Sequence, residues 1–494
     1  FVLRLSLLTL FITFLCLYSF KDWFKALCGL VLLMAVVEHP DMPKSLLGIQ
    51  GLNPWNITLV FVCVGYLLAA KKEKLKWDLP PLLTWLLVVY FLLIFIGFFR
   101  LTSDDVNFQA WANLQYGKDE SNLAMISEFL INCMKWVVPG FLMFQGCRDR
   151  VRLKWAVTAI VLVYFLLALQ VIRWMPLSNI TSGGEALKER SLKILVNEVG
   201  FHRVNLAMML SGAFWALFSC SMLLAKQHKI YIYAGCVVVL IGLALTGGRT
   251  GYATWAAIGG VLVLLRWRKL IVLSPFPVIA VLVFFPGVAD RLGAGFGGKD
   301  IDSNVALVQA EPVNEGQPHW YTVTAGRSVA WPRVLEKISE APWVGCGREA
   351  MIATGTSMYL IRELGESFPH PHNAYLQWIL DNGFLGAVPV FLFYFLMLKY
   401  SISSFLRKDN MTHAAIGGVA TSLLLALLIA GFGSQSFYPR EGAVGMWCAL
   451  GLLMRLRLGY FEEHVLTNAS EDEADTRNIE STPMWLKWSS RGNF

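Results

Sequence analysis

The residues best suited to chemistry gather in the one long polar stretch of an otherwise apolar chain, between Phe285 and His372. This stretch ends in Pro369-His370-Pro371-His372-Asn373-Ala374-Tyr375-Leu376, directly before an apolar run. An imidazole near its ordinary pKa can take a proton from a hydroxyl group. We therefore interpret His372 as a candidate general base, although a histidine that only caps the following helix fits the same pattern. The neighbouring polar side chains are candidate binding residues: His370, Asn373 and Tyr375.

A histidine pair of this kind is also a pattern to test for metal binding. In an extended segment, residues i and i+2 point to the same face, so His370 and His372 could clip a metal ion. His319 is the only other histidine in the polar stretch, and its spacing is not that of a third ligand. We expect no metal site and no cofactor.

The tightest connection between two apolar runs is Thr246-Gly247-Gly248-Arg249-Thr250-Gly251. Glycines let the backbone turn sharply, which fixes Arg249 at the mouth between two helices. An arginine at membrane depth is costly, so it is usually paired or lines a watery cavity. The alternative is a turn residue whose side chain reaches the membrane surface. The spacing is not that of a P-loop.

A second arginine, Arg327, begins the segment Gly326-Arg327-Ser328-Val329-Ala330-Trp331. The apolar spacing from Arg327 to about Ser339 predicts a helix, and both a helix N-terminus and a guanidinium suit a phosphate. The alternative is an ordinary solvated helix start. Trp331 is a candidate for stacking on a sugar ring, although tryptophans in such chains commonly mark the membrane interface.

Two further arginines are expected at the same face of the membrane. Arg203 lies in Gly200-Phe201-His202-Arg203-Val204-Asn205, and Arg440 follows Phe437-Tyr438-Pro439. Several arginines that converge above a bilayer indicate a diphosphate or polyanionic ligand. We interpret Arg203 and Arg440 as binding residues, and Arg333 and Arg348 as surface or supporting groups.

The composition is that of a polytopic α-helical membrane protein. Mean hydropathy is +0.54, with 56% hydrophobic and only 15% charged residues. Apolar runs of about 17–25 residues recur, the length that crosses roughly 30 Å of hydrocarbon as helix, and they lack strand alternation. We expect an all-α bundle of about 12 or 13 helices. The expected spans are 3–19, 25–38, 55–70, 81–99, 126–144, 154–173, 204–224, 230–246, 251–266, 270–285, 382–399, 412–434 and 441–454.

Orientation follows from Lys and Arg in the short loops, which the positive-inside rule places in the cytoplasm. These residues fall on alternate turns, at 71–76, 148–154, 226–229, 266–269, 407–408 and 455–457. The segments on the other turns then face outward: 100–125, 174–203, 247–251, 286–381 and 434–442. The net charge of +8 is therefore a matter of topology, and we expect no nucleic-acid partner.

We expect four parts along the chain: transmembrane helices with short loops over 1–285, a long periplasmic loop over 286–381 that carries part of the active site, transmembrane helices over 382–460, and a cytoplasmic tail over 461–494. In the long loop, 286–325 is rich in Gly, Asp, Asn and Pro and is expected to be irregular, and a second helix is expected near Ala350 to Leu364.

The remaining features carry less information about function. The nine cysteines are scattered and mostly lie in apolar runs, without the spacing of a zinc site or redox pair. The apolar start from Val2 to Phe20 lacks a signal-peptide cleavage site, so we expect it to be a span. Because the chain opens on Phe1 rather than Met, we expect that it has lost a few residues or been processed.

Three of these motifs resemble a known family. The turn Leu245 to Gly251 is similar to the arginine-bearing turn of the O-antigen ligase and polymerase superfamily, which are bacterial polytopic membrane glycosyltransferases. Gly326 to Trp331, followed by Glu340 to Gly347, resembles the same family. The clearest likeness is His372-Asn373-Ala374-Tyr375-Leu376-Gln377-Trp378 followed by Asn382-Gly383-Phe384-Leu385-Gly386. The likeness extends over residues 200 to 400 in motif order.

This resemblance implies a metal-independent inverting glycosyltransferase with a GT-C-like helical fold. Its donor would be a glycan on an undecaprenyl diphosphate carrier, used at the periplasmic face of the bacterial inner membrane, and its acceptor a glycan or glycolipid hydroxyl. On the family pattern, Arg249 and Arg327 would hold the diphosphate, His372 would take the acceptor proton, and Arg203 would be an accessory cation.

Several alternatives stay open at this point. The likeness to ligases, which attach glycan to lipid A-core, is not separable from the likeness to polymerases, which join repeat units. The product could be lipopolysaccharide, exopolysaccharide or glycoprotein. A transporter or flippase of a lipid-linked glycan belongs to a different class. Transporters place polar residues at the bilayer midplane, whereas the polar groups here lie outside the spans.

Overall fold

The computed structural model describes residues 2–46, 49–180, 184–273, 286–293, 324, 326–365, 367–433 and 435–459. The expected tail over 461–494 and most of the expected irregular segment 286–325 lie outside these residues. The part of 286–325 that the structure describes includes a helix, α15 (Pro286–Gly293), so the expectation of irregular structure is wrong there. The strands in the described residues are a short antiparallel pair, β1 (Ser45–Leu46) with β2 (Ile49–Gln50).

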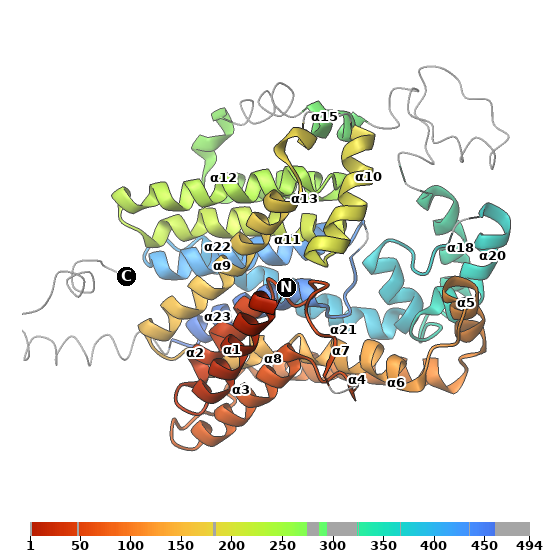
Figure 1. The fold of residues 1–494 in the computed structure, drawn as a ribbon, viewed down its shortest axis with the longest axis horizontal. Coiled ribbons are helices and arrows are strands. Elements are labelled where there is room, and N and C mark those ends of the chain that lie inside the picture. The colour runs from red at the N-terminus through yellow and green to blue at the C-terminus, as the bar shows by residue number, and fades with distance from the viewer. Residues whose placement is uncertain are drawn as a thin grey trace, which may run out of the picture.

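The molecule is an all-α bundle, and in Figure 1 its long helices run side by side with their axes close to horizontal. Seven helices in the described part of the chain are long and apolar enough to cross a membrane. They are α4 (Pro81–Ser103), the composite helix Asn122–Gly146, α9 (Arg150–Trp174), α11 with its 3-10 extension (Arg203–Leu223), α12 with its 3-10 start (Lys226–Leu245), α21 (Ala374–Phe405) and α22 (Met411–Ala430).

The composite helix Asn122–Gly146 contains a π-helical turn, and it consists of α6 (Asn122–Met125), η1 (Ile126–Ile131), α7 (Asn132–Lys135) and α8 (Val138–Gly146). Shorter apolar helices complete the bundle: α1 (Val2–Tyr18), α2 (Trp23–Leu33), α3 (Pro54–Ala70) and α13 (Arg249–Leu265). The last helix of the bundle is α23 (Val444–Arg457). The predicted class, a polytopic bundle of transmembrane helices, is confirmed. Of the expected span 270–285, the structure describes only residues 270–273, the end of a 3-10 helix, η6 (Arg268–Leu273).

The centre of the bundle is α22, whose apolar window is 89% buried, packed against α11, whose window is 78% buried. Small residues let these two helices approach closely. A Cβ added at Gly212 on α11 would lie 2.8 Å from the Cβ of Ala426 on α22, and Gly418 on α22 packs on Ser219 of α11. Such small-residue contacts are the usual means of packing helices within lipid, where apolar burial alone does not drive helices together.

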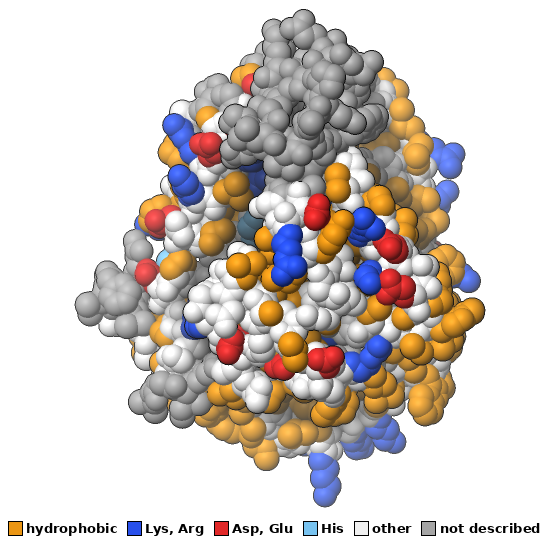
Figure 2. Space-filling model, turned by 90° about the vertical axis from the view of Figure 1, so that its right-hand side faces the viewer, with side chains coloured by type: hydrophobic (Ala, Val, Ile, Leu, Met, Phe, Trp, Pro, Cys, Tyr) orange, Lys and Arg blue, Asp and Glu red, His pale blue; other side chains and the backbone are white. Residues whose placement is uncertain are grey.

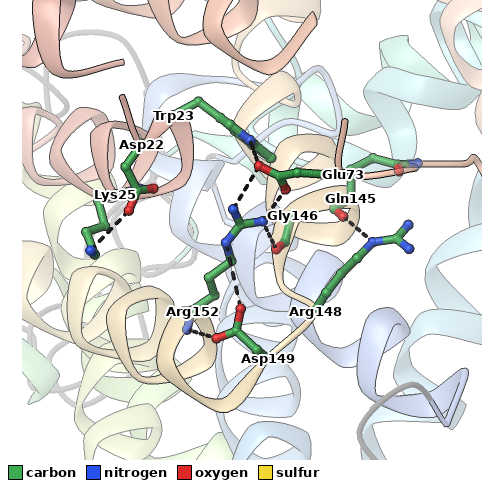
Figure 3. Close-up of polar contacts among 9 residues, drawn as sticks. All are labelled: Asp22, Trp23, Lys25, Glu73, Gln145, Gly146, Arg148, Asp149 and Arg152. Atoms are coloured by element: carbon green, nitrogen blue, oxygen red, sulfur yellow. Dashed lines mark hydrogen bonds and ion pairs between the residues drawn. The ribbon is translucent and has the colours of Figure 1, made fainter. Parts of the chain in front are cut away.

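One end of the bundle carries the Lys/Arg-rich loops, and we call it the cationic end. Figure 3 shows part of it: Arg152 binds both oxygens of Glu73 with N–O distances of 2.6 and 3.0 Å, and Trp23 Nε1 donates to Glu73 at 3.0 Å. Nearby, the buried Arg455 forms a bidentate pair with Asp78 at 2.7 and 2.8 Å. These ion pairs join loops that are far apart in the sequence into one layer.

The opposite end, which we call the outer end, carries the helical connections, and it faces the viewer in Figure 2. Its elements are α5 (Val106–Tyr116), η2 (Leu177–Ile180), α10 (Gly184–Ile194), η3 (Leu195–Val199), α15, α18 (Arg327–Glu340), α19 (Ala350–Ala353), α20 (Thr356–Leu364) and η7 (Glu441–Ala443). The predicted helix from Arg327 matches α18, whereas the one predicted near Ala350 to Leu364 is broken in two at Gly355. Charged side chains of both signs are scattered over the middle of this face, and apolar ones gather along its rim (Figure 2).

The loop 341–349 holds these outer helices on the bundle by pairing with a break in α21. Gly383 has φ +64° and ψ −175°, which interrupts the helix. The backbone groups released there bond to the loop: Phe384 N donates to Pro342 O at 2.8 Å, and Cys346 N donates to Leu380 O at 2.7 Å. Because the backbone groups of both α21 and the loop are hydrogen-bonded, the break costs little free energy of folding. The same bonds fix the loop against α21.

We predict that Gly251→Ala destabilises the protein by about 1–3 kcal/mol, because it overpacks the junction of α11 and α13. The added Cβ would overlap the Cβ of Ala207 on α11. Gly260→Ala on the same helix is the matched control, since its Cβ would meet nothing within 4 Å. The midpoint of thermal unfolding in detergent should fall for the first variant only. Equal midpoints for the two variants would show that α11 and α13 do not pack as described.

Candidate active site

Arg203, Arg249 and Arg327 are each the first residue of a helix, α11, α13 and α18 respectively. The N-terminus of a helix carries partial positive charge and unpaired N–H groups, so a cation there is unfavourable and an anion is favourable. All of these helix starts lie at the outer end. The three positions therefore favour binding of an anion rather than stability of the helices.

The turn before α13 places Arg249. Gly247 has φ +64°, a left-handed conformation that favours glycine, and a Cβ at Gly248 would lie 2.9 Å from the Cβ of Ala207. Arg203 Nη1 donates to Gly247 O at 3.1 Å. Arg203 thus braces the turn that carries Arg249, and its guanidinium lies beside that turn.

Arg327 reaches the same place from the long loop. It follows Gly326, whose φ of +76° lets the chain turn into α18. Its Nε is buried and makes no hydrogen bond within the described part of the chain. Burial, and then the charge of Arg249, lower the pKa of Arg327, so the two guanidinium groups lie close enough to repel each other. A buried guanidinium nitrogen beside a second cation is a site prepared for an anion.

The histidine segment is held at several points. Trp331 Nε1 donates to Pro371 O at 2.9 Å, Ala374 N donates to Gly431 O at 2.7 Å, and Ser357 Oγ donates to Phe368 O. His372 N donates to His370 Nδ1 at 3.2 Å, which leaves the proton of a neutral His370 on Nε2. His372 has φ +52°, a conformation that costs a non-glycine residue about 1–3 kcal/mol and persists where surrounding contacts enforce it.

Both histidines are neutral at neutral pH. Burial lowers the pKa of His372 to about 4, and the charges of Arg327 and His202 contribute. Burial lowers the pKa of His370 to about 3, and repulsion of its protonated form by Arg440, Arg327 and a protonated His372 contributes. A neutral imidazole is the form that accepts a proton, and burial and the neighbouring cations hold down its basicity. An anion bound by Arg327 would offset the positive charge and raise the pKa of His372.

The structure thus brings together most of the residues predicted for the site. Arg327 interacts electrostatically with Arg249, His370 and His372, and Arg440 with His370. The exposed Arg440 is therefore at the edge of this group. We call the group the outer-end cluster, and its members are Arg203, Arg249, Arg327, His370, His372 and Arg440.

The remaining predicted residues, Trp331, Asn373 and Tyr375, use their polar atoms within the protein. Asn373 Oδ1 caps α21 by accepting from Tyr375 N at 3.0 Å and Leu376 N at 3.2 Å. Tyr375 donates its hydroxyl to Leu428 O at 2.8 Å, and the indole nitrogen of Trp331 is bound to Pro371 O. These contacts position the histidine segment, and a direct role in binding substrate stays a prediction.

Two acidic residues near the cluster had no signal in the sequence. Gly200, two residues before His202, packs directly on the backbone of Glu38 and His39. Burial raises the pKa of Glu38 to about 7, and the carboxylate of Glu441, next to Arg440, adds to the increase. Burial also raises the pKa of Glu441. The outer end therefore holds two half-buried acidic residues as well as its cations, brought there only by the tertiary fold.

Behind the cluster lies a buried network, of which the sequence singled out only Arg348, as a surface or supporting group. Arg348 is only 3% exposed, and its guanidinium lies 3.2 Å from the centre of the Tyr438 ring. Tyr438 in turn donates to Asp381 Oδ2 at 3.0 Å, and Asp381 Oδ1 accepts from Ala350 N at 3.1 Å. This network ties loop 341–349 to α21 and to the segment before Arg440. Arg333, in contrast, is exposed and pairs with Glu336 at 2.8 Å, as expected for a surface group.

Comparison with known proteins agrees with this site. Residues 234–391 match the family model described as O-antigen ligase. The matched segment includes Arg249, Arg327, His370 and His372, and the predicted resemblance to the O-antigen ligase and polymerase superfamily is confirmed for it. A search of curated proteins finds no match. The match supports an O-antigen ligase-like function for a multi-pass membrane protein.

We predict that Arg327→Gln raises the pKa of His372 above its value of about 4, because a cation that disfavours imidazolium is removed. The pKa should stay below the ordinary value, since burial is its largest cause. NMR titration of ring-labelled histidine measures it, with His372→Gln to assign the signal. Arg333→Gln, on the exposed side of the same helix, is the control and should leave the pKa unchanged. An unchanged pKa of His372 in Arg327→Gln would show that the charge of Arg327 does not act on His372.

Proposed function

We propose that this protein is an inverting, metal-independent glycosyltransferase that moves a glycan from an undecaprenyl-diphosphate carrier to an acceptor hydroxyl. Joining to a lipid A-core acceptor, as ligases do, is the activity we favour on the family match. The supporting observation is the meeting of Arg249 and Arg327, from separate parts of the chain, beside His372.

The proposed chemistry needs only groups that are present in the cluster. The acceptor hydroxyl attacks the anomeric carbon of the donor sugar from the face opposite the diphosphate, and its proton passes to His372. The bond from the anomeric carbon to the diphosphate oxygen breaks, and both its electrons leave with the diphosphate. Arg249 and Arg327 offset the charge that develops on this leaving group, with Arg203 as an accessory cation.

Donor binding would also prepare the base. The diphosphate would place negative charge next to Arg327, one of the groups that keep the pKa of His372 low. The pKa of His372 would then rise in the complex toward the range in which a general base is most effective. The base would therefore be strongest when the donor is in place.

We further propose that the cationic end faces the cytoplasm and the outer end faces the periplasm of a bacterial inner membrane, in line with the positive-inside rule. The long loop and the start of α21 would then carry part of the active site outside the membrane. The lipid tail of the donor would enter between helices, with its diphosphate at the level of the lipid headgroups.

We predict that Arg249→Ala and Arg327→Ala each lower kcat of glycan transfer by roughly 10²-fold or more, as removal of one preorganised charge-stabilising group does. His372→Ala should lower it by roughly 10²–10⁴-fold. The assay combines purified protein with a defined lipid-linked oligosaccharide and candidate acceptors, and mass spectrometry identifies the product.

Arg333→Ala is the control from the same helix as Arg327, and it should retain wild-type activity within about twofold, as expected for an exposed ion pair. Each variant is first shown to elute and unfold like the wild type. Wild-type glycan transfer by His372→Ala would show that His372 is not the general base. Movement of the lipid-linked glycan across the membrane of proteoliposomes, without a new glycosidic bond, would show that the protein is a transporter rather than a transferase.

A further inference from the structure

A large cavity lies at the cationic end, far from the outer-end cluster. It has a volume of about 880 Å³ and is bounded by α9, the end of α11, the start of α12 and the start of α22. This volume is within the range of about 300–1,000 Å³ typical of small-molecule sites. Four of the helices that are long enough to cross a membrane contribute its walls, so the cavity lies at the depth of lipid.

The interior of the cavity is apolar. The walls from α9 are Leu153, Val157, Val161, Leu162 and Phe165, and they face Leu217 and Leu223. Gly235 on α12 leaves part of this space open, because a Cβ there would lie 3.0 Å from Leu217 Cδ2. The lining therefore suits a hydrocarbon chain rather than a polar ligand.

The mouth of the cavity is cationic. Arg150 and Lys154 lie one turn apart on α9, both are exposed, and both line the cavity. Asn410, Thr412 and His413 line it at the start of α22. The residues that line the cavity, all of them described, include no Asp or Glu.

We propose that this cavity binds one anionic glycerophospholipid of the surrounding membrane leaflet, with an acyl chain along the α9 wall and the phosphate at Arg150 and Lys154. Charge complementarity selects an anionic headgroup, and the apolar depth selects a lipid over a free phosphate. The lipid would fill the junction of α9, α11 and α12. The latter two helices carry Arg203 and the Arg249 turn at their other ends, so the lipid would stabilise the scaffold of the outer-end cluster.

The test measures lipid retained by the full chain. The protein is purified in mild detergent, then incubated with phosphatidylglycerol or phosphatidylcholine, and bound lipid is counted by native mass spectrometry. Wild type should bind one phosphatidylglycerol at least tenfold more tightly than phosphatidylcholine. The double variant Arg150→Gln with Lys154→Gln should lose this preference, and both substitutions are at exposed positions, where folding is little affected.

A second variant tests the apolar part of the site. Thr158 is exposed and lines the cavity, so Thr158→Trp should block the chain and weaken binding of both lipids. Leu169→Trp, on the same helix but outside the cavity, is its control. Lys71→Gln with Lys72→Gln controls for the loss of two positive charges at the same end.

The outcomes are distinct. The site is supported if Arg150→Gln with Lys154→Gln loses the preference for phosphatidylglycerol, Thr158→Trp binds both lipids more weakly, and the control variants show neither change. Unchanged lipid preference in Arg150→Gln with Lys154→Gln, or an equal loss in its control, overturns it. Displacement of bound phosphatidylglycerol by water-soluble glycerol phosphate would also overturn it, since a free phosphate group would then suffice.

Discussion

The approach of Arg327 to Arg249 and to the two histidines is the interaction on which the outer end of the molecule depends. Burial is the largest cause of the lowered pKa values of Arg327, His370 and His372, and repulsion by neighbouring cations lowers them further. Each of the three arginines also begins a helix, where a cation is unfavourable. Packing elsewhere holds these groups together.

That packing comes from close helix contacts and from the loop 341–349. The glycines at 248 and 251 allow α13 to pack on Ala207 of α11, which sets the positions of Arg249 and Arg203 together. Trp331 and the cap at Asn373 hold His372 in its left-handed conformation. Arg348 packs on Tyr438, and the hydrogen bond from Tyr438 to Asp381 of α21 links the loop to that helix. Packing thus holds the mutually repelling cations of the site in fixed positions, which is the condition for electrostatic preorganisation.

The sequence predicted the parts of the fold that depend on local pattern. Apolar runs of membrane length placed the expected span 412–434 on α22 (Met411–Ala430), and helical spacing placed α18. It also singled out Arg249 at a tight turn at membrane depth, Arg327 at a predicted helix start, and His372 as an imidazole directly before an apolar span. What it could not predict depends on tertiary contacts. The expected span 382–399 lies within α21, which starts earlier, at Ala374. This helix continues past the break at Gly383 because a distant loop forms hydrogen bonds with the backbone there. Glu38 joins the site only through its contact with Gly200, and nothing in its own neighbourhood indicates a functional residue.

The most direct measurement is an electron cryomicroscopy structure of the protein with a prenyl-diphosphate-linked glycan bound. We expect the diphosphate to lie between Arg249 and Arg327, with an oxygen accepting a hydrogen bond from the buried Nε of Arg327, and the donor sugar next to His372. A diphosphate bound at the cationic end, or at the outer end without contact to either arginine, would contradict the account.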